Sequence, residues 1–302
     1  MPVQPFPNRL HPLPPNTWQL LGHRGARAEA LENSALAFAH AQQLDIQGKK
    51  LDGVEFDIQM TADGEFVVTH DEKLSRLAGQ QGWVSDYRLA KLRALYQSDI
   101  PRFQTTLNPN FLRQKILPLC DLPPYLQHYR HLEFEIKTHA KTQHSQLVEN
   151  LLRLLSTATW QTLPISLTSF DTQILDQLQR QQAYLPPSLR YPTGLLLEPS
   201  TTLATQVAFL PSQDKHGEML IYDTFNLACR LGCQQVGIYY PLINAKLINI
   251  ARGFGLRVSA WTVNDPNCVK RLLDDGVNCV ITDTPTTLLT APLLMSHLYQ
   301  RH

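Results

Sequence analysis

Short apolar segments alternate with stretches of helical periodicity along most of the chain. Eight segments rich in aliphatic and β-branched side chains predict strands: Trp18–Leu21, Val54–Met60, Leu132–Thr138, Ile165–Phe170, Thr193–Leu197, Gln235–Tyr240, Arg257–Val263 and Cys279–Thr282. Several of them are almost continuously apolar, which is typical of strands that a parallel sheet buries on both faces.

Helical spacing of apolar residues fills the intervals between these strands. It is clearest over Ser34–Leu44, Ser145–Leu155, Asn244–Arg252 and Asn267–Asp275. Gly253 and Gly276 follow the last two segments closely and are predicted to end those helices. Eight strands with helices between them predict one α/β domain, a (β/α)₈ TIM barrel. A doubly wound open sheet is the alternative, because periodicity alone does not show closure.

Two connections are too long for ordinary loops of such a barrel. One runs from Asp71 to Leu119 and includes a helical pattern over Ser85–Tyr96, which predicts a small helical insertion at about 71–119, after the second strand. The other runs from Glu198 to Leu231. Residues 1–16 are rich in proline and are expected to be disordered, whereas residues 17–302 are expected to form a single domain.

Composition and charge exclude several classes of protein. The 302 residues include 27 Lys and Arg and 26 Asp and Glu, so a net charge of +1 gives no basic footprint for nucleic acid. No apolar run approaches the roughly 18 residues of a membrane span, and the start of the chain lacks the apolar core of a secretory signal. Five cysteines lack zinc-ligand spacing and indicate reduced thiols in a cytoplasmic protein. Composition says nothing about oligomeric state.

Charged side chains interrupt two of the predicted strands at alternate positions. They share one strand face, with apolar residues on the other, in Val54-Glu55-Phe56-Asp57 and in Glu133-Phe134-Glu135-Ile136-Lys137. Carboxylates that face a barrel interior are unfavourable unless a cation joins them. A divalent ion such as Mg²⁺ or Ca²⁺ would satisfy them, and so would salt bridges to Lys137 and an arginine.

The end of the first predicted strand favours a site over simple salt bridges. His23 and Arg24 stand there between two glycines, and the planar fork of Arg24 suits a phosphate group. A second histidine, His70, ends the extended segment Phe66–His70. Two histidines at strand ends, together with carboxylates and an arginine, are typical of an active site.

The ordered set of motifs resembles the glycerophosphodiester phosphodiesterase family. The resemblance extends from about Gln19 to Pro285 and rests on these segments in order: His23-Arg24-Gly25, Glu32-Asn33-Ser34, Val54-Glu55-Phe56-Asp57, Thr61–Gly64 with Val67–Asp71, Leu74 with Arg76, Glu135-Ile136-Lys137, Thr168–Asp171, Trp261–Asn264 and Ile281–Pro285. Two segments depart from the family pattern: Leu31 replaces a usual proline, and Ile116–Asp121 differs from a motif that is structural in the family.

The resemblance implies a TIM barrel that hydrolyses glycerophosphodiesters to sn-glycerol 3-phosphate and an alcohol. It implies one divalent metal ion, Mg²⁺ or Ca²⁺, as the cofactor and a small-molecule glycerophosphodiester as the partner. It assigns the residues as follows: metal ligands Glu55, Asp57 and Glu135; catalytic acid and base His23 and His70; phosphate ligands Arg24 and Lys137; a partner of Arg24, Glu32; and an apolar wall beside the glycerol moiety, Trp261.

Some polar residues keep two interpretations. Glu133 is an additional inward carboxylate, and a buried salt bridge to a lysine or arginine is favoured over a fourth metal ligand. Asp71 and Asp283 are either partners of the site or caps of loops. Five other histidines lack a partner at a telling spacing and are expected to be solvated: His128, His131, His139, His144 and His216.

Two other functions compete with the leading hypothesis. A lysophospholipase D-like or sphingomyelinase D-like barrel would use similar histidines and carboxylates on lipids, but 71–119 shows no clear apolar groove for an acyl chain. A catalytically silent barrel that binds glycerophosphodiesters would be expected to lack a histidine or a carboxylate, and here every such position is filled.

Overall fold

A computed structural model describes residues 18–98, 113–199 and 215–299 of the chain. The eight predicted strands all form: β1 (Gln19–His23), β2 (Gly53–Met60), β7 (His131–Ile136), β8 (Ile165–Ser169), β9 (Thr193–Leu197), β10 (Gln235–Tyr239), β11 (Arg257–Trp261) and β12 (Cys279–Thr282). The proline-rich segment 1–16 lies outside the described residues, so its expected disorder stays a prediction.

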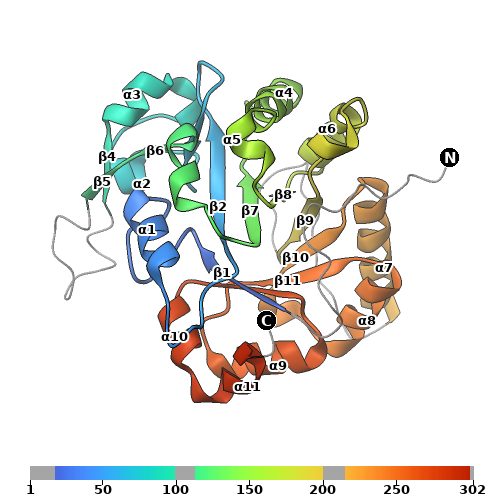
Figure 1. Ribbon diagram of the computed structural model, residues 1–302. Helices are drawn as coiled ribbons and strands as arrows, with labels where there is room; N and C mark the ends of the chain where they lie inside the picture. Colours follow the sequence, from blue (N-terminus) through green and yellow to red (C-terminus); the bar gives the residue numbers. More distant parts are fainter. Residues whose placement is uncertain (1–17, 99–112, 200–214, 300–302) are drawn as a thin grey trace.

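These strands run parallel and close into a barrel. Each pairs with its neighbour in the order β1, β12, β11, β10, β9, β8, β7, β2, and β1 pairs with β2 through Leu21↔Gly53 and His23↔Glu55. Figure 1 shows the strands at the centre and helices around them. The predicted (β/α)₈ TIM barrel is therefore confirmed, and the open sheet is excluded by the β1–β2 pairing.

Helices follow the barrel strands and cover their outer faces. They are α1 (Ala35–Gln43), α4 (His144–Leu155), α5 (Ala158–Gln161), α6 (Thr172–Gln182), α7 (Lys215–Arg230), α8 (Ala245–Gly253), α9 (Pro266–Asp275), α10 (Pro285–Thr290) and α11 (Met295–Tyr299). Gly276 ends α9 in the left-handed region with φ 99°, as predicted. Helix α8 also ends at Gly253, but Gly253 is its last helical residue, and the left-handed residue that follows is Gly255 with φ 71°.

The insertion after β2 combines two short helices with strands. β3 (Phe66–Val68) pairs antiparallel with β2, and β6 (Leu117–Pro118) pairs with β3. Between them lie α2 (Ser75–Ala78), a 3₁₀ turn at Val84–Asp86, α3 (Leu89–Ala94) and a two-stranded ribbon of β4 (Tyr96–Ser98) and β5 (Arg113–Lys115). The predicted helix over 85–96 is thus shorter, and a small core of its own, centred on Val67, Val84 and Ile116, supports the insertion.

The alternation of charged and apolar residues is explained by the two faces of β2 and β7. Phe56 and Phe134 point outward and pack with ring centroids 4.3 Å apart, and Phe38 of α1 meets Phe56 at 5.4 Å. Trp160 of α5 closes this aromatic layer against Phe134. Because successive side chains of a strand point to opposite faces, the carboxylates between these aromatics face the barrel interior.

In the part of the chain that the structure describes, no helix is long and apolar enough to cross a membrane. All five cysteines are free thiols. The cytoplasmic location stays a prediction.

Candidate active site

A cavity of about 660 Å³ opens at the end of the barrel where the parallel strands finish. Seven of the predicted site residues line it: His23, Arg24, Glu55, His70, Glu135, Lys137 and Trp261. Asp57 and Glu32 lie behind its wall, and each contacts Arg24. The barrel therefore brings together residues that are up to 238 positions apart in the sequence.

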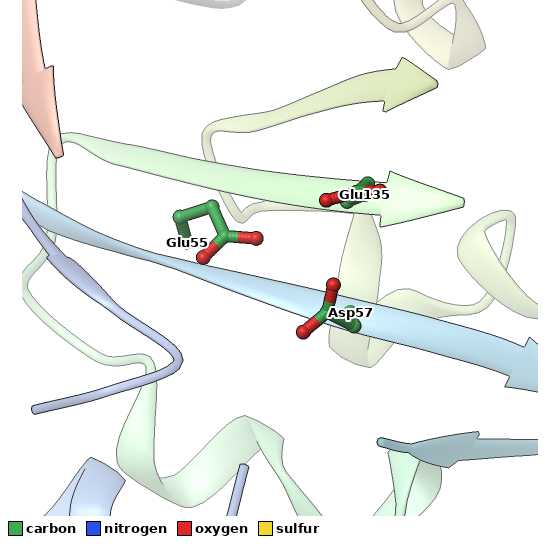
Figure 2. A group of neighbouring side chains, drawn as sticks. All are labelled: Glu55, Asp57 and Glu135. Carbon is green, nitrogen blue, oxygen red and sulfur yellow. The ribbon is translucent and has the colours of Figure 1, made fainter. Parts of the chain in front are cut away.

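Three carboxylates meet on the inner face of β2 and β7. The register pairs Asp57 with Glu135, and Glu55 lies one pleat earlier on β2. Each of the three offers an oxygen, and these oxygens all lie within 4.8 Å of one another. Figure 2 shows the side chains of both strands converging on the same interior space.

Cations already compensate part of this negative charge. Lys137 Nζ lies 3.1 Å from Asp57 Oδ1 and also contacts Glu135, and Arg24 Nε lies 3.2 Å from Asp57 Oδ2. Burial alone would raise the pKa of Asp57. Lys137 and Arg24 outweigh burial and together hold this pKa well below its usual range. Burial and then the repulsion from Asp57 and Glu135 raise the pKa of Glu55 well above its usual value. Without a further cation, the carboxyl of Glu55 thus holds its proton more readily than a free glutamate does.

These residues fit a divalent cation. Asp57 Oδ1 and Glu135 Oε1 are buried and take part in no well-formed hydrogen bond. Oxygen donors from three carboxylates are the chemistry that Mg²⁺ and Ca²⁺ prefer. A divalent ion would also relieve the repulsion that raises the pKa of Glu55.

His23 is held by a carboxylate from the last barrel strand. Its Nδ1 lies 2.6 Å from Asp283 Oδ1, just beyond β12, and its Nε2 lies 3.7 Å from Glu55 Oε2. Burial alone would raise the pKa of Asp283, but His23 and then Arg27 outweigh burial and lower this pKa. The Asp283 carboxylate is therefore ionised and accepts a hydrogen bond from His23 Nδ1–H. Burial, with Arg24 next, lowers the pKa of His23 to about 4. The ring therefore presents Nε2 toward the carboxylate cluster.

His70 has an analogous partner in its own loop. Its Nδ1 lies 2.8 Å from Asp71 Oδ1. The side chain of Gln59 fixes this loop, because its amide donates to the carbonyl oxygens of Thr69, His70 and Asp71 at 2.9, 3.1 and 2.8 Å. Gln59 lies on β2, so the strand that carries two predicted metal ligands also positions His70.

Arg24 is built into a tight turn. Its φ is 50° and that of Gly25 is 87°, so both residues are left-handed. The turn directs the Arg24 backbone N–H to Glu55 Oε2 at 3.2 Å and its Nη1 to Glu32 Oε1 at 2.9 Å. The predicted contact between Glu32 and Arg24 is present.

Apolar side chains gather on the opposite side of the cavity, where Thr168 and Glu198 are also among the lining residues. Phe170, Leu196, Trp261 and Ile281 line this side from β8 to β12. The rings of Phe170 and Trp261 meet edge to face at 5.6 Å, and Tyr239 lies 5.8 Å from Trp261. A ligand in this cavity would meet the clustered carboxylates and cations on the side of β1, β2 and β7 and a wall that includes aromatic and aliphatic side chains on the other.

Residues 23–287 match the glycerophosphoryl diester phosphodiesterase family. The chain belongs to this family. Its members are phosphoric diester hydrolases, and the family that the ordered motifs indicated is confirmed by a match over most of the chain.

Relatives of this phosphodiesterase family match nearly the whole chain. A glycerophosphodiester phosphodiesterase of Bacillus subtilis is 27% identical over 281 residues, 90% of this chain and 86% of its own length. A lysophospholipase D of Rattus norvegicus is 25% identical and covers 89% of this chain and 84% of its own length. The solved structure of an Oleispira antarctica phosphodiesterase, in complex with the product sn-glycerol-3-phosphate, has a TM-score of 0.69 at 22% identity and covers 91% of this chain and 95% of its own.

Within this family barrel, several polar residues differ from their expected roles. Glu133 is 1% exposed and accepts a hydrogen bond from Gln235 at 3.1 Å, with His131 Nε2 at 3.9 Å. An amide and a histidine thus make direct contacts with Glu133, the expected arginine, Arg257, acts on it electrostatically, and Glu133 is not among the clustered ligands. The expectation of solvated histidines was wrong for His131, which is 1% exposed, and for His144, which contacts Asp171 at 2.8 Å.

Two arginines that border the site received no role from the motifs. Arg27 lies 2.7 Å from Glu32 and 3.8 Å from Asp283, and Arg76 contacts Glu32 and Asp71. Asp71 and Asp283 act as partners of the two histidines, which decides between the two interpretations left open. Spacing in the sequence could not reveal the His23–Asp283 pair, whose members are 260 positions apart.

Proposed function

We propose that this chain hydrolyses glycerophosphodiesters to sn-glycerol 3-phosphate and an alcohol. The observation that carries the proposal is one cavity that combines an acidic cluster, two cationic side chains and two carboxylate-held histidines. Family membership supports this reaction class, and the product bound to the Oleispira antarctica phosphodiesterase supports glycerol 3-phosphate as the product.

In this proposal Glu55, Asp57 and Glu135 hold one divalent metal ion, Mg²⁺ or Ca²⁺. When bound, such an ion polarises a phosphoryl oxygen and offsets negative charge. Arg24 and Lys137 flank the same cluster and bind the phosphate oxygens, because both remain charged at neutral pH and both are largely withdrawn from water. Trp261 and Phe170 contact the carbon chain of the glycerol moiety from the apolar side.

His23 and His70 exchange the protons of the reaction. A new P–O bond forms to the attacking oxygen of water, or of the substrate's own 2-hydroxyl through a cyclic phosphate, and the P–O bond to the alcohol breaks. One imidazole takes the proton of the attacking oxygen and the other gives a proton to the departing alkoxide. Both rings hold Nδ1 against a carboxylate, so Nε2 is the atom that exchanges the proton in each.

A lysophospholipid is the second candidate substrate. The apolar side chains of the cavity, such as Leu196 and Trp261, would accept carbon chains, and the Rattus norvegicus relative is a lysophospholipase D. The charged side serves both substrate classes equally. The length of the acyl chain therefore decides between them.

The test is product formation by the full chain after exhaustive chelation, with and without added Mg²⁺ or Ca²⁺. The substrates are glycerophosphocholine, glycerophosphoethanolamine and lysophosphatidylcholine, and glycerol 3-phosphate or lysophosphatidic acid is measured. We expect glycerol 3-phosphate only when a divalent ion is added. Glu55→Gln should lose activity at least about a hundredfold while the unfolding temperature stays near that of the wild type.

Glu149→Gln is the matched control, because Glu149 is exposed on α4, away from the site. Full turnover after chelation would contradict the metal site. Faster turnover of lysophosphatidylcholine would favour the second candidate, and binding without turnover of any substrate would show a silent binding protein.

A further inference from the structure

Two arginines outside the predicted catalytic set connect the carboxylates that hold the histidines. Arg27 Nη1 lies 3.8 Å from Asp283 Oδ2, and Asp283 holds His23. Arg76 Nη2 lies 3.1 Å from Asp71 Oδ1, and its Nε contacts the other oxygen of the same carboxylate. Each arginine therefore touches the partner of one histidine.

Both arginines also converge on one buried carboxylate. The side chain of Glu32 is 1% exposed. Its Oε2 accepts from Arg27 Nε at 2.7 Å, and its Oε1 accepts from Arg76 Nη2 at 2.7 Å and from Arg24 Nη1 at 2.9 Å. Glu32 is thus the point where contacts from the β1 loop and from the insertion meet.

We propose that Arg27 and Arg76 are positioning residues that hold, through Glu32, the two histidine–carboxylate pairs in a fixed relation across the cavity. The inference rests on the proposed roles of the two histidines. A guanidinium is suited to this task, because its planar fork can donate to two carboxylates at once, whereas an ammonium acts as a single point charge.

The charges of the network support this assignment. Burial alone would raise the pKa of Glu32. Arg24 and then Arg76 outweigh burial and lower this pKa to about 2, so the carboxylate stays ionised. Burial would also raise the pKa of Asp71, but His70 and then Arg76 outweigh burial and lower the pKa of that carboxylate. An ionised Asp71 or Asp283 can only accept, which fixes the proton of each imidazole on Nδ1 and leaves Nε2 for proton exchange.

The two arms of the network differ in origin and exposure. Arg27 belongs to the loop after β1 and is 26% exposed, whereas Arg76 belongs to α2 of the insertion and is 40% exposed. Arg76 thereby ties the insertion to the barrel beside the cavity. Loss of Arg27 should disturb the ring of His23, and loss of Arg76 should disturb the ring of His70.

The test uses the full chain labelled with ¹⁵N in its histidine rings. Ring signals of His23 and His70 are assigned from His23→Ala and His70→Ala and then followed in Arg27→Ala and Arg76→Ala. We expect Arg27→Ala to shift the signals of His23 most and Arg76→Ala those of His70 most, with a smaller shift at the other histidine through Glu32. Arg88→Ala is the matched control, because Arg88 is 80% exposed in the same insertion and pairs with Asp63.

Kinetics supply the second readout. Each alanine variant should lower kcat about tenfold or more with little change in KM, because a lost charge-assisted contact displaces a group that acts in the transition state. Arg76→Lys should recover only part of this loss. The Arg27→Ala/Arg76→Ala double variant should lose less than the product of the single losses, because both act through Glu32.

Ring signals that stay unchanged in both variants, or that shift most at the histidine farther from the substituted arginine, would overturn the inference. So would a raised KM with unchanged kcat, which would indicate direct contact with substrate. A wild-type chain inactive on glycerophosphodiesters would contradict the proposed function, and the ring signals would still decide whether the two arginines position the histidines.

Discussion

At the scale of single residues, the two histidines occupy matching environments of different depth. The side chain of His23 is 11% exposed and that of His70 is 34% exposed, and each holds Nδ1 against an aspartate. The two rings thus have the same orientation but different access to solvent. This difference is compatible with one histidine acting as a general acid and the other as a general base. The roles can be separated by changing the leaving group.

We predict that His23→Ala and His70→Ala each lower kcat/KM at least about a hundredfold on an alkyl glycerophosphodiester, the range expected for loss of a general acid or base. A p-nitrophenyl glycerophosphodiester releases p-nitrophenolate, which departs without protonation. This substrate should therefore restore most of the rate only in the variant that lacks the general acid. Steady-state kinetics of both variants on both substrates check this. Equal rescue of the two variants would contradict the division of roles, and His128→Ala, in a loop before β7, serves as the control.

The gathering of several candidate residues at one site could be predicted from single motifs, because a residue's type and its place along or just after a strand suffice to suggest chemistry. His23, Arg24, Glu55 and Asp57 belong to this group. Arg27 and Asp283 do not, because their roles depend on contacts between the first and last turns of the barrel. Closure of the barrel creates those contacts, and spacing along the chain does not encode them.

At the scale of elements, the turn that follows β1 depends on a glycine. Gly25 has φ 87°, and a Cβ there would lie 2.8 Å from the backbone carbon of Ala37 and 2.9 Å from its Cβ. Ala37 belongs to α1, which cannot move away without disturbing the layer around Phe38. The glycine therefore sets how closely α1 approaches the loop that carries Arg24.

We predict that Gly25→Ala destabilises the chain by about 2–4 kcal/mol, the sum of a left-handed strain and an overpacked contact. Gly48→Ala is a matched control, because Gly48 has φ 81° and no atom within 4 Å of the position of its Cβ. It should cost only about 1 kcal/mol. Urea unfolding of both variants measures the difference, and equal losses would show that the contact with Ala37 does not matter.

The elements that the sequence predicted best are those with one dominant pattern. The strands predicted at Ile165–Phe170 and Thr193–Leu197 formed as Ile165–Ser169 and Thr193–Leu197, with nearly the predicted ends. The helix predicted over 85–96 was shortened at both ends, since Val84 and Leu92 pack into the small core of the insertion and Tyr96 begins a ribbon strand. Tertiary packing decided those boundaries, and periodicity did not contain them.

At the scale of the whole molecule, closure joins residues from opposite ends of the chain into one electrostatic system. The β1–β2 and β1–β12 pairings bring Glu55 and Asp283 to either side of His23. Apolar periodicity predicted the strands but left the open sheet as an alternative. Only the pairing of the first strand with both neighbours distinguishes the two folds.

Glu32, at the centre of this system, should make stability depend on acid. Burial alone would raise the pKa of Glu32, but Arg24, Arg76 and Arg27 outweigh burial and lower this pKa to about 2. A carboxylate with a lowered folded pKa contributes stability that is complete above its unfolded pKa, about 4.3 for a glutamate, and that is lost as the pH falls toward its folded pKa.

We therefore predict that the unfolding free energy of the wild type exceeds that of Glu32→Gln by an amount that is constant from pH 7 to about 5 and declines below it. The part that titrates is at most about 3 kcal/mol, because each unit of pKa shift corresponds to about 1.4 kcal/mol. Urea unfolding between pH 7 and pH 3 measures this difference. For Glu149→Gln, whose side chain is exposed, the same difference should stay near zero at every pH. A wild-type advantage over Glu32→Gln that does not decline toward pH 3 would mean that packing, and not the charge of Glu32, stabilises the junction between the barrel and its insertion.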